Sequence, residues 1–431
     1  MSVLFKNAEV FTRDGIKKID VFLDGKILRT DKACFPDSFE KEIECEGLFL
    51  FPGFADVHVH FREPGFSYKE TILSGSYAAA HGGYTEVCTM PNLKPVPSTL
   101  ENLKKELDII ARDSVIHIYP IGAITMEQTG RGELSDIEEI SPYVIAFSDD
   151  GKGIQEEKLM IAAMKRISKT GKLITAHCEV ESELKPGGCI NAGKYAELHK
   201  HIGINNASEY LEVERDIRLS KETGCKINIC HVSTKESVNL IREAKKQNIK
   251  VTAETAPHYL IFTDIDLEED GKWKMNPPIR SESDREALLE GIKDGTIDSI
   301  ITDHAPHSEA EKSKGLDGSA FGIVGLETCF AVMYSNLVLK SKAMTLEKLL
   351  ELMCVNPRKI FNLAGSKYIE DNCRADFVIM DLEKVYKVDS KKFLSKGKST
   401  PFNGMEVRGE TVATYVDGKR IYDRENGIIN A

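Results

Sequence analysis

Strand-like and helix-like segments alternate through the middle of the chain, and this alternation limits the fold more than any other feature. The strand-like runs are 84–90, 115–124, 143–147, 173–177, 226–231, 250–255 and 298–303. Helix-like segments at 98–112, 156–170, 207–223, 235–247 and 284–293 stand between many of them. Repeated strand and helix units of this kind favour α/β architecture with a parallel (β/α)8 barrel of the TIM type. A dinucleotide-binding open sheet is disfavoured because no G-x-G-x-x-G follows the first strand.

Local signals place several helix ends. A capping box formed by Ser98 and Glu101 predicts the start of the helix 98–112. Gly171 and Gly224 follow two other predicted helices and are expected to stop them, because glycine readily adopts the left-handed conformation at a helix end.

Both ends of the chain have a different, all-β pattern. Short strand-like runs separated by Asp-Gly turns occur at 2–7, 19–23 and 26–29, and again at 376–380, 410–416 and 419–422. The two ends are therefore predicted to form one small β-sandwich domain from residues 1–50 and 366–431, with the barrel at 51–365.

Composition limits the cellular location and the classes of partner that this protein can have. The formal charge of −11 argues against nucleic acid as a partner, because phosphate backbones require basic surface. The sequence has neither an apolar run long enough to span a bilayer nor an apolar block near residue 1 that would mark a signal peptide, which predicts a cytoplasmic protein without membrane association. The ten cysteines include no C-x-x-C pair and are expected to be reduced and largely buried. Cys189 lies in a loop-like setting and is assigned no role.

The segment 53–65, GFADVHVHFREPG, carries the first chemical signal. Asp56, His58 and His60 alternate with apolar residues, so a strand would present both imidazoles on one face. In a barrel, polar residues at the C-terminal ends of strands converge on one mouth. The residues at such positions are His58, His60, Asn92, Asp150, His177, His231 and Asp303. Four histidines and two aspartates are typical of a two-metal site for zinc or a similar ion. The histidines at 81, 117, 199, 201 and 258 are instead expected to be core residues.

Several motifs together resemble type I dihydroorotases of the amidohydrolase superfamily, which are cyclic amidohydrolases. The motifs are DVHVHFREPG (56–65), CTMPN (88–92), FSDDG (147–151), TAHCE (175–179), ICHVST (229–234), MNPPIR (275–280), TDHAPH (302–307) and FGIVGLET (321–328). They are spread over almost the whole chain. The resemblance implies a reversible, zinc-dependent cyclisation of N-carbamoyl-L-aspartate to (S)-dihydroorotate and water, in de novo pyrimidine (UMP) biosynthesis.

The resemblance also implies roles for individual residues. The expected ligands of two zinc ions per subunit are His58, His60, Asp150, His177, His231 and Asp303. Many relatives bridge the metals with a carbamylated lysine; here Asp150 is expected in that place, with Lys152 as the less favoured alternative. Asp303 is expected to act as general base and general acid for a hydroxide shared by the two ions. The expected substrate-binding residues are Arg62, Asn92, Asn276, His307, Phe321 and Gly322. The charged run 308–314 is expected to form a solvated flap.

Two other functions remain open at this point. Another cyclic amidohydrolase, an allantoinase or dihydropyrimidinase, would share the fold. An inactive relative that serves as a structural partner of aspartate transcarbamoylase is a further alternative, although all six expected metal ligands are intact. The family suggests a homodimer or a complex with aspartate transcarbamoylase.

Overall fold

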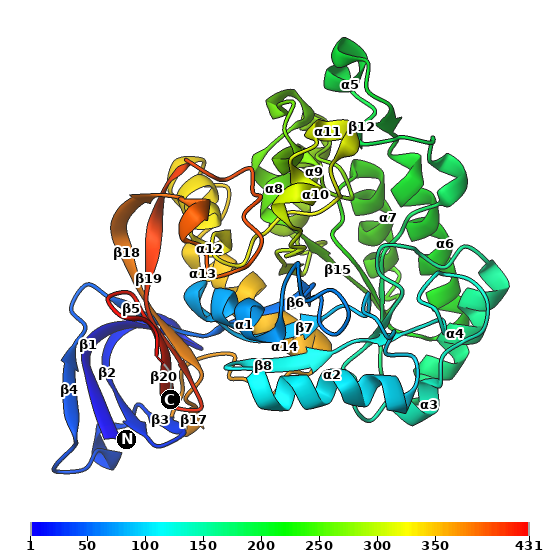
Figure 1. Cartoon of the computed structure of the whole chain (residues 1–431). Coiled ribbons are helices and arrows are strands. Elements are labelled where there is room, and N and C mark those ends of the chain that lie inside the picture. Colours follow the sequence, from blue (N-terminus) through cyan, green and yellow to red (C-terminus); the bar gives the residue numbers. More distant parts are fainter. Residues whose placement is uncertain (1, 430–431) are drawn as a thin grey trace.

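The computed structural model describes residues 2–429 as a barrel joined to a β domain (Figure 1). Eight parallel strand positions follow one another around the barrel. They are β6 (Phe54–Val59), β7 (Tyr84–Thr89), β8 (His117–Pro120) with β9 (Gly122–Ala123), β10 (Phe147–Ser148), β11 (Ile174–Ala176), β14 (Ile227–Ile229), β15 (Val251–Thr255) and β16 (Ser299–Ile300). A parallel bridge between Val59 and His304 closes the ring. The predicted (β/α)8 barrel is confirmed.

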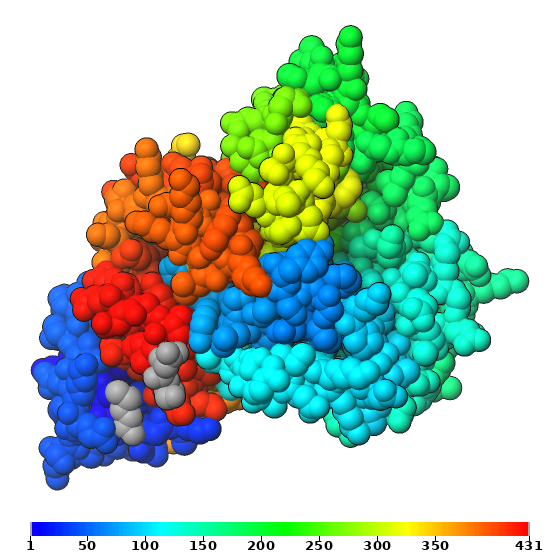
Figure 2. Space-filling view, in the orientation of Figure 1, coloured from blue at the N-terminus to red at the C-terminus, as the bar shows by residue number. Residues whose placement is uncertain are grey.

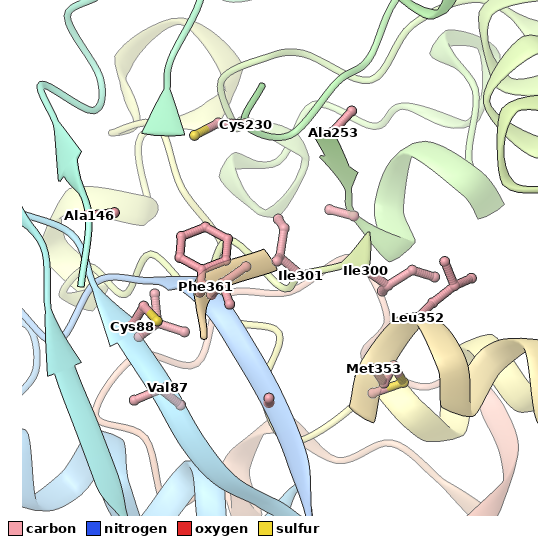
Figure 3. Packing of buried hydrophobic residues seen from close by; sticks show 14 of the residues in the cluster. Val87, Cys88, Ala146, Cys230, Ala253, Ile300, Ile301, Leu352, Met353 and Phe361 are labelled. Atoms are coloured by element: carbon pink, nitrogen blue, oxygen red, sulfur yellow. The ribbon is translucent and has the colours of Figure 1, made fainter. Parts of the chain in front are cut away.

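Helices cover the outside of the barrel. The longer ones are α1 (Ile72–His81), α2 (Leu100–Asp113), α4 (Glu157–Lys169), α6 (Ala207–Thr223), α7 (Lys235–Lys246) and α9 (Glu282–Asp294). The shorter ones are α3 (Ile137–Ile140), α5 (Lys194–His199), α8 (Pro257–Ile261), α10 (Glu309–Lys312), α11 (Gly315–Gly318), α12 (Cys329–Met333), α13 (Leu346–Leu350) and α14 (Asn356–Phe361). Figure 3 shows buried side chains from the strands, such as Val87 and Ile300, in one cluster with Leu352, Met353 and Phe361 of the C-terminal helical segment, residues 346–361. Among residues 2–429, no helix has the length and apolar character needed to cross a membrane.

Strands from both ends of the chain pair in one ten-stranded sheet that forms the β-sandwich. Its strands are β1 (Ser2–Thr12), β2 (Gly15–Asp24), β3 (Ile27–Arg29), β4 (Lys41–Glu44), β5 (Phe49–Pro52), β17 (Cys373–Arg374), β18 (Phe377–Lys387), β19 (Glu406–Val416), β20 (Lys419–Asp423) and β21 (Gly427–Ile428). The N- and C-terminal parts meet where β5 pairs antiparallel with β18. The Phe5 ring packs edge-on against Phe377 and Tyr415, and these three buried rings lie in the core of the domain.

A buried ion pair fastens the C-terminal helical segment to the barrel. Arg358 donates from Nε to Glu86 Oε2 at 2.6 Å and from a terminal nitrogen to the Gly53 carbonyl oxygen at 2.6 Å. The other oxygen of Glu86 accepts from the Tyr119 hydroxyl and the Gly365 backbone amide, each at 2.8 Å. Both charged side chains are fully buried, so each depends on the other for its charge balance.

Glu86→Ala is expected to lower the free energy of unfolding by about 3–5 kcal/mol, because it leaves the buried Arg358 guanidinium unpaired. Chemical denaturation of the two proteins measures the change. Asp14→Ala serves as the control, since the ion pair of Asp14 with Lys17 is exposed, and it is expected to leave the transition in place. An unchanged transition for Glu86→Ala would contradict the structural role of the pair.

Candidate active site

The predicted metal ligands lie at one end of the barrel, at or just past the C-terminal ends of their strands. His58 lies on β6 and His60 follows it; Asp150, His177 and His231 follow β10, β11 and β14 in the same way. Asp303 lies three residues after β16. Each of the six side chains is buried. The barrel topology therefore brings together residues that are up to 245 positions apart in the chain.

Asp150 is the centre of this cluster. Its Oδ1 lies 3.3 Å from His58 Nε2, 3.6 Å from His177 Nδ1 and 3.6 Å from His231 Nε2. Its Oδ2 lies 3.5 Å from His60 Nε2. Asp303 Oδ1 lies 3.1 Å from His60 Nε2 and 3.6 Å from His58 Nε2. The two carboxylates thus face the same imidazole edges, with Asp150 common to all four histidines.

Burial and charge act against each other on these groups. Burial alone would raise the pKa of Asp150, but the charge of His58 and the proximity of His177 and His231 outweigh it and hold the pKa well below its usual range. Burial likewise opposes ionisation of Asp303, but the hydrogen bond from His60 and the charges of neighbouring imidazoles lower its pKa to about 2. Both carboxylates are therefore ionised at neutral pH and supply the negative charge that a cation site needs.

Several polar atoms in the cluster have no hydrogen-bond partner among the described residues. They are His58 Nε2, Asp150 Oδ1, His177 Nε2 and His231 Nδ1. Buried polar atoms are almost always paired, so unpartnered ones grouped at a single site call for an explanation. Imidazole nitrogens and carboxylate oxygens are the ligands that zinc and similar divalent ions take. The donor set and its unpartnered atoms fit a metal centre.

Two carboxylates outside the predicted ligand set support His58. Glu254 Oε1 lies 2.8 Å from His58 Nδ1, which leaves Nε2 of the same ring to face Asp150. Asp56 accepts from the backbone amide of His58 and, across the barrel seam, from that of Thr302, each at 3.0 Å. Such hydrogen bonds orient a metal-binding imidazole. Glu254 could have been noticed in the sequence as an acidic residue inside the buried strand β15.

The predicted substrate-binding residues border the cluster. Asn92 Oδ1 lies 2.7 Å from His60 Nδ1, and its amide nitrogen donates to the Asp150 carbonyl oxygen at 3.2 Å. Arg62 Nε is 3.4 Å from the Pro306 carbonyl oxygen. Asn92 therefore orients a predicted metal ligand as well as lying beside the site.

His307, Phe321 and Gly322 meet on the loop after β16. His307 Nε2 donates to the Phe321 carbonyl oxygen at 2.7 Å, and its Nδ1 accepts from Lys69 at 3.2 Å. Burial, together with the charges of Arg62 and Lys69, lowers the pKa of His307 to about 3, so the ring is neutral. Gly322 has a φ of +132°, and a Cβ there would lie 2.6 Å from the Ala305 carbonyl oxygen, so only glycine fits.

Asn276 lies on a different loop and donates to Glu179 Oε1 at 2.9 Å. Glu179 Oε2 in turn lies 3.7 Å from His177 Nε2. Glu179 thus connects the predicted ring-binding residue with the metal-ligand cluster.

Three residues of the site have positive φ angles, which are rare for residues other than glycine. They are Arg62 at +61°, His231 at +32° and Asp303 at +46°. A conformation of this kind costs about 1–3 kcal/mol and persists where the surrounding fold holds it, often at functional sites. Here it aims side chains that follow strand ends into the barrel mouth.

The charged loop 308–314 was predicted to be a solvated flap, and residues 309, 310, 313 and 314 are exposed. Lys312 differs, because it is buried and donates to the carbonyl oxygens of Lys274 and Ala320. An ion pair of 2.8 Å between Lys69 and Glu311 holds the same loop against the segment after β6, and Figure 2 shows these yellow and blue segments in contact. Five further histidines were predicted to be core residues, and this is right for His258, which is buried. It is wrong for His199, which is exposed because α5 projects from the barrel, and His81, His117 and His201 are only partly buried.

Comparison with known proteins defines the class. A model of the amidohydrolase family matches residues 49–421, and the chain belongs to this family. An L-hydantoinase (dihydropyrimidinase) from Arthrobacter aurescens superimposes with a TM-score of 0.88 at 25% identity, covering 99% of this chain and 97% of that one. A dihydropyrimidinase from Brevibacillus agri gives 0.84 at 19% identity, covering 100% and 96%.

The most informative sequence relatives are dihydroorotases. The protein of that name from Fusobacterium nucleatum is 47% identical over 98% of this chain and 99% of its own length. The one from Bacillus cytotoxicus is 43% identical over the full length of both chains. The resemblance predicted from the motifs is confirmed.

Proposed function

We propose that this protein is a dihydroorotase, which reversibly cyclises N-carbamoyl-L-aspartate to (S)-dihydroorotate and water in pyrimidine (UMP) biosynthesis. The observation that carries the proposal is the full-length similarity to dihydroorotases at 42–47% identity. The buried cluster of four histidines and two aspartates at the barrel mouth supports it.

The cluster would hold two zinc ions. His58, His60 and Asp303 would bind one, His177 and His231 the other, and Asp150 would lie between them. When bound, divalent ions of this kind lower the pKa of a water molecule and polarise the amide carbonyl. Lys152 is exposed, whereas Asp150 is buried among the imidazoles, which favours the aspartate over a carbamylated lysine as the bridge.

Asp303 would move the proton. Its carboxylate stays ionised because its pKa lies at about 2. In the hydrolytic direction it would accept a proton from the attacking water and deliver it to the ring nitrogen that leaves. In the cyclising direction the same steps run backward, and the protonated carboxyl returns its proton as water departs.

Arg62, Asn92 and His307 would bind the substrate carboxylate. A guanidinium can hold a carboxylate through two parallel hydrogen bonds. A neutral ring without that carboxylate would leave the half-buried Arg62 poorly paired, which would disfavour hydantoin or dihydrouracil. Asn276 and the backbone near Phe321 and Gly322 would contact the ring amide.

Arg62→Ala is expected to raise the KM for dihydroorotate by about 10-fold to 100-fold with a smaller change in kcat, because a charged hydrogen bond contributes about 1.5–3 kcal/mol. Steady-state kinetics measure both constants. Arg13→Ala, which removes an exposed arginine of the β domain, is the control. A fall in kcat without a change in KM would show that Arg62 does not act in binding.

The structural neighbours favour one second candidate, a hydantoinase or dihydropyrimidinase activity. Parallel assays of the purified protein with dihydroorotate, hydantoin, dihydrouracil and allantoin test both functions. Efficient turnover of dihydroorotate alone supports the proposal, whereas turnover confined to the neutral rings would overturn it.

We further propose a cytoplasmic homodimer that can also assemble with aspartate transcarbamoylase, as the resemblance suggests. Light scattering of the protein with and without that enzyme tests the assembly. The intact set of six ligand residues argues against an inactive partner protein.

A further inference from the structure

A second group of metal-binding side chains lies outside the barrel mouth. Cys189 precedes β12 (Ile190–Asn191), His201 precedes β13 (Gly203–Ile204), and Asp317 lies on α11. Asp317 Oδ1 is 2.8 Å from His201 Nδ1 and 3.3 Å from Cys189 Sγ, and the three ligand atoms all lie within 4.8 Å of one another. Figure 1 shows α11 near the projecting β12 and α5 segment.

Two of the three side chains in this cluster are buried, and hydrogen bonds fix the orientation of the histidine. Cys189 is 1% exposed and the His201 side chain 8% exposed, whereas Asp317 is open to solvent. His201 Nε2 lies 3.0 Å from Glu269 Oε1, and the Tyr195 hydroxyl donates to the same oxygen at 2.9 Å. A carboxylate on the far nitrogen of a histidine is the arrangement that orients a metal-binding imidazole. It directs Nδ1 toward the Cys189 thiol and the Asp317 carboxylate.

We propose that Cys189, His201 and Asp317 form a second zinc site, separate from the active site. Thiolate, imidazole and carboxylate are zinc ligands, and their usual bond lengths place tetrahedral ligand atoms roughly 3.3–3.5 Å apart. Asp317 Oδ1 already lies 2.8 and 3.3 Å from the other two ligand atoms, and all three atoms lie within 4.8 Å of one another, so side-chain shifts would bring them to these distances. Water completes the coordination on the exposed side of Asp317.

Binding would exchange a proton for the ion. Burial and the hydrogen bond to Asp317 raise the pKa of the Cys189 thiol to about 11, so the metal-free thiol is protonated. Zinc forms a bond to the sulfur, and the thiol proton passes to solvent. The ion would then join the loop after β11 to the loop that carries His307 and Phe321.

Another group of possible metal ligands, in contrast, is unsuited to bind a cation. His117, Asp376 and Asp417 also converge, but Arg374 lies among them, with Nε 3.0 Å from Asp376 and a terminal nitrogen 2.8 Å from Asp417. That guanidinium already supplies the positive charge. At the Cys189 site the nearby Lys274 ammonium instead donates to the backbone oxygen of Asp317 at 2.8 Å, which leaves the Asp317 carboxylate to the histidine and the thiol.

Metal analysis of the full chain tests the proposal. The protein is stripped with a chelator, reloaded with excess Zn²⁺, desalted and assayed for zinc per chain. Cys189→Ser and Asp317→Asn are expected to bind one zinc fewer than the wild type. Cys34→Ser, which removes an exposed free thiol, is the matched control and is expected to keep the full amount. Equal zinc content in all four proteins would overturn the proposal.

Cobalt gives a readout that the proposed active-site ligands do not produce. The wild type and Cys34→Ser loaded with Co²⁺ are expected to show sulfur-to-cobalt charge-transfer absorption, and Cys189→Ser is expected to lack it. The band would be independent of dihydroorotase activity. Its absence from the wild type, or its persistence in Cys189→Ser, would show that Cys189 is not a ligand.

Discussion

Asp303→Asn is expected to retain bound metal and lose about 10²-fold to 10⁴-fold in kcat, the range that a positioned general acid and base contributes. The amide keeps the size of the carboxylate and one oxygen that can face the metal, but it cannot accept the proton. The wild-type carboxylate is ionised at neutral pH and can accept it.

The test measures dihydroorotate hydrolysis and metal content on the same sample. Glu309→Gln, which neutralises an exposed carboxylate on the same loop, is the control and is expected to keep wild-type turnover. Near-normal kcat in Asp303→Asn would rule out the proposed proton transfer. Loss of metal along with activity would mean that Asp303 acts chiefly as a ligand.

Asp150→Ala is expected to act on the metal itself, with loss of bound metal and a fall in activity of at least about 1,000-fold. Among residues 2–429, Asp150 is the one carboxylate within 3.6 Å of nitrogens from His58, His177 and His231, so its removal takes away the negative charge that these three histidines share. Metal ions at such a site supply several kcal/mol of transition-state stabilisation, and each 1.4 kcal/mol is a factor of ten.

Zinc content and turnover of Asp150→Ala are compared with those of Lys152→Met. The lysine variant is expected to match the wild type, because Lys152 is exposed. The reverse result, with metal lost in Lys152→Met and kept in Asp150→Ala, would identify the lysine as the bridge.

Local sequence signals predicted a helix end correctly where the end depends on the backbone conformation of one residue. Helix α6 ends at Thr223, as predicted, because Gly224 adopts a φ of +72°. The predicted capping box at Ser98 is wrong. Thr99 is the N-cap and accepts from the Asn102 amide, while Ser98 is buried and its hydroxyl faces the Val96 carbonyl oxygen. Two adjacent hydroxyl residues compete for one cap, and tertiary packing chooses between them.

The six proposed metal ligands could be predicted from the sequence because parallel strands of a barrel deliver their C-terminal ends to one mouth. Their supporting contacts could not. Glu254 touches His58 because β15 and β6 are separated only by β16 around the closed barrel, and nothing near Glu254 in the sequence shows this. The Cys189 cluster was missed for the same reason, since Asp317 lies 128 residues away from the thiol.

Hydrolysis of dihydroorotate by the purified protein, with zinc measured in the same sample, tests directly whether this chain is a metal-dependent dihydroorotase. We expect turnover with zinc bound, loss of turnover on chelation and recovery when zinc is returned. A fully metal-loaded protein that leaves dihydroorotate unchanged, even with aspartate transcarbamoylase added, would rule out this function.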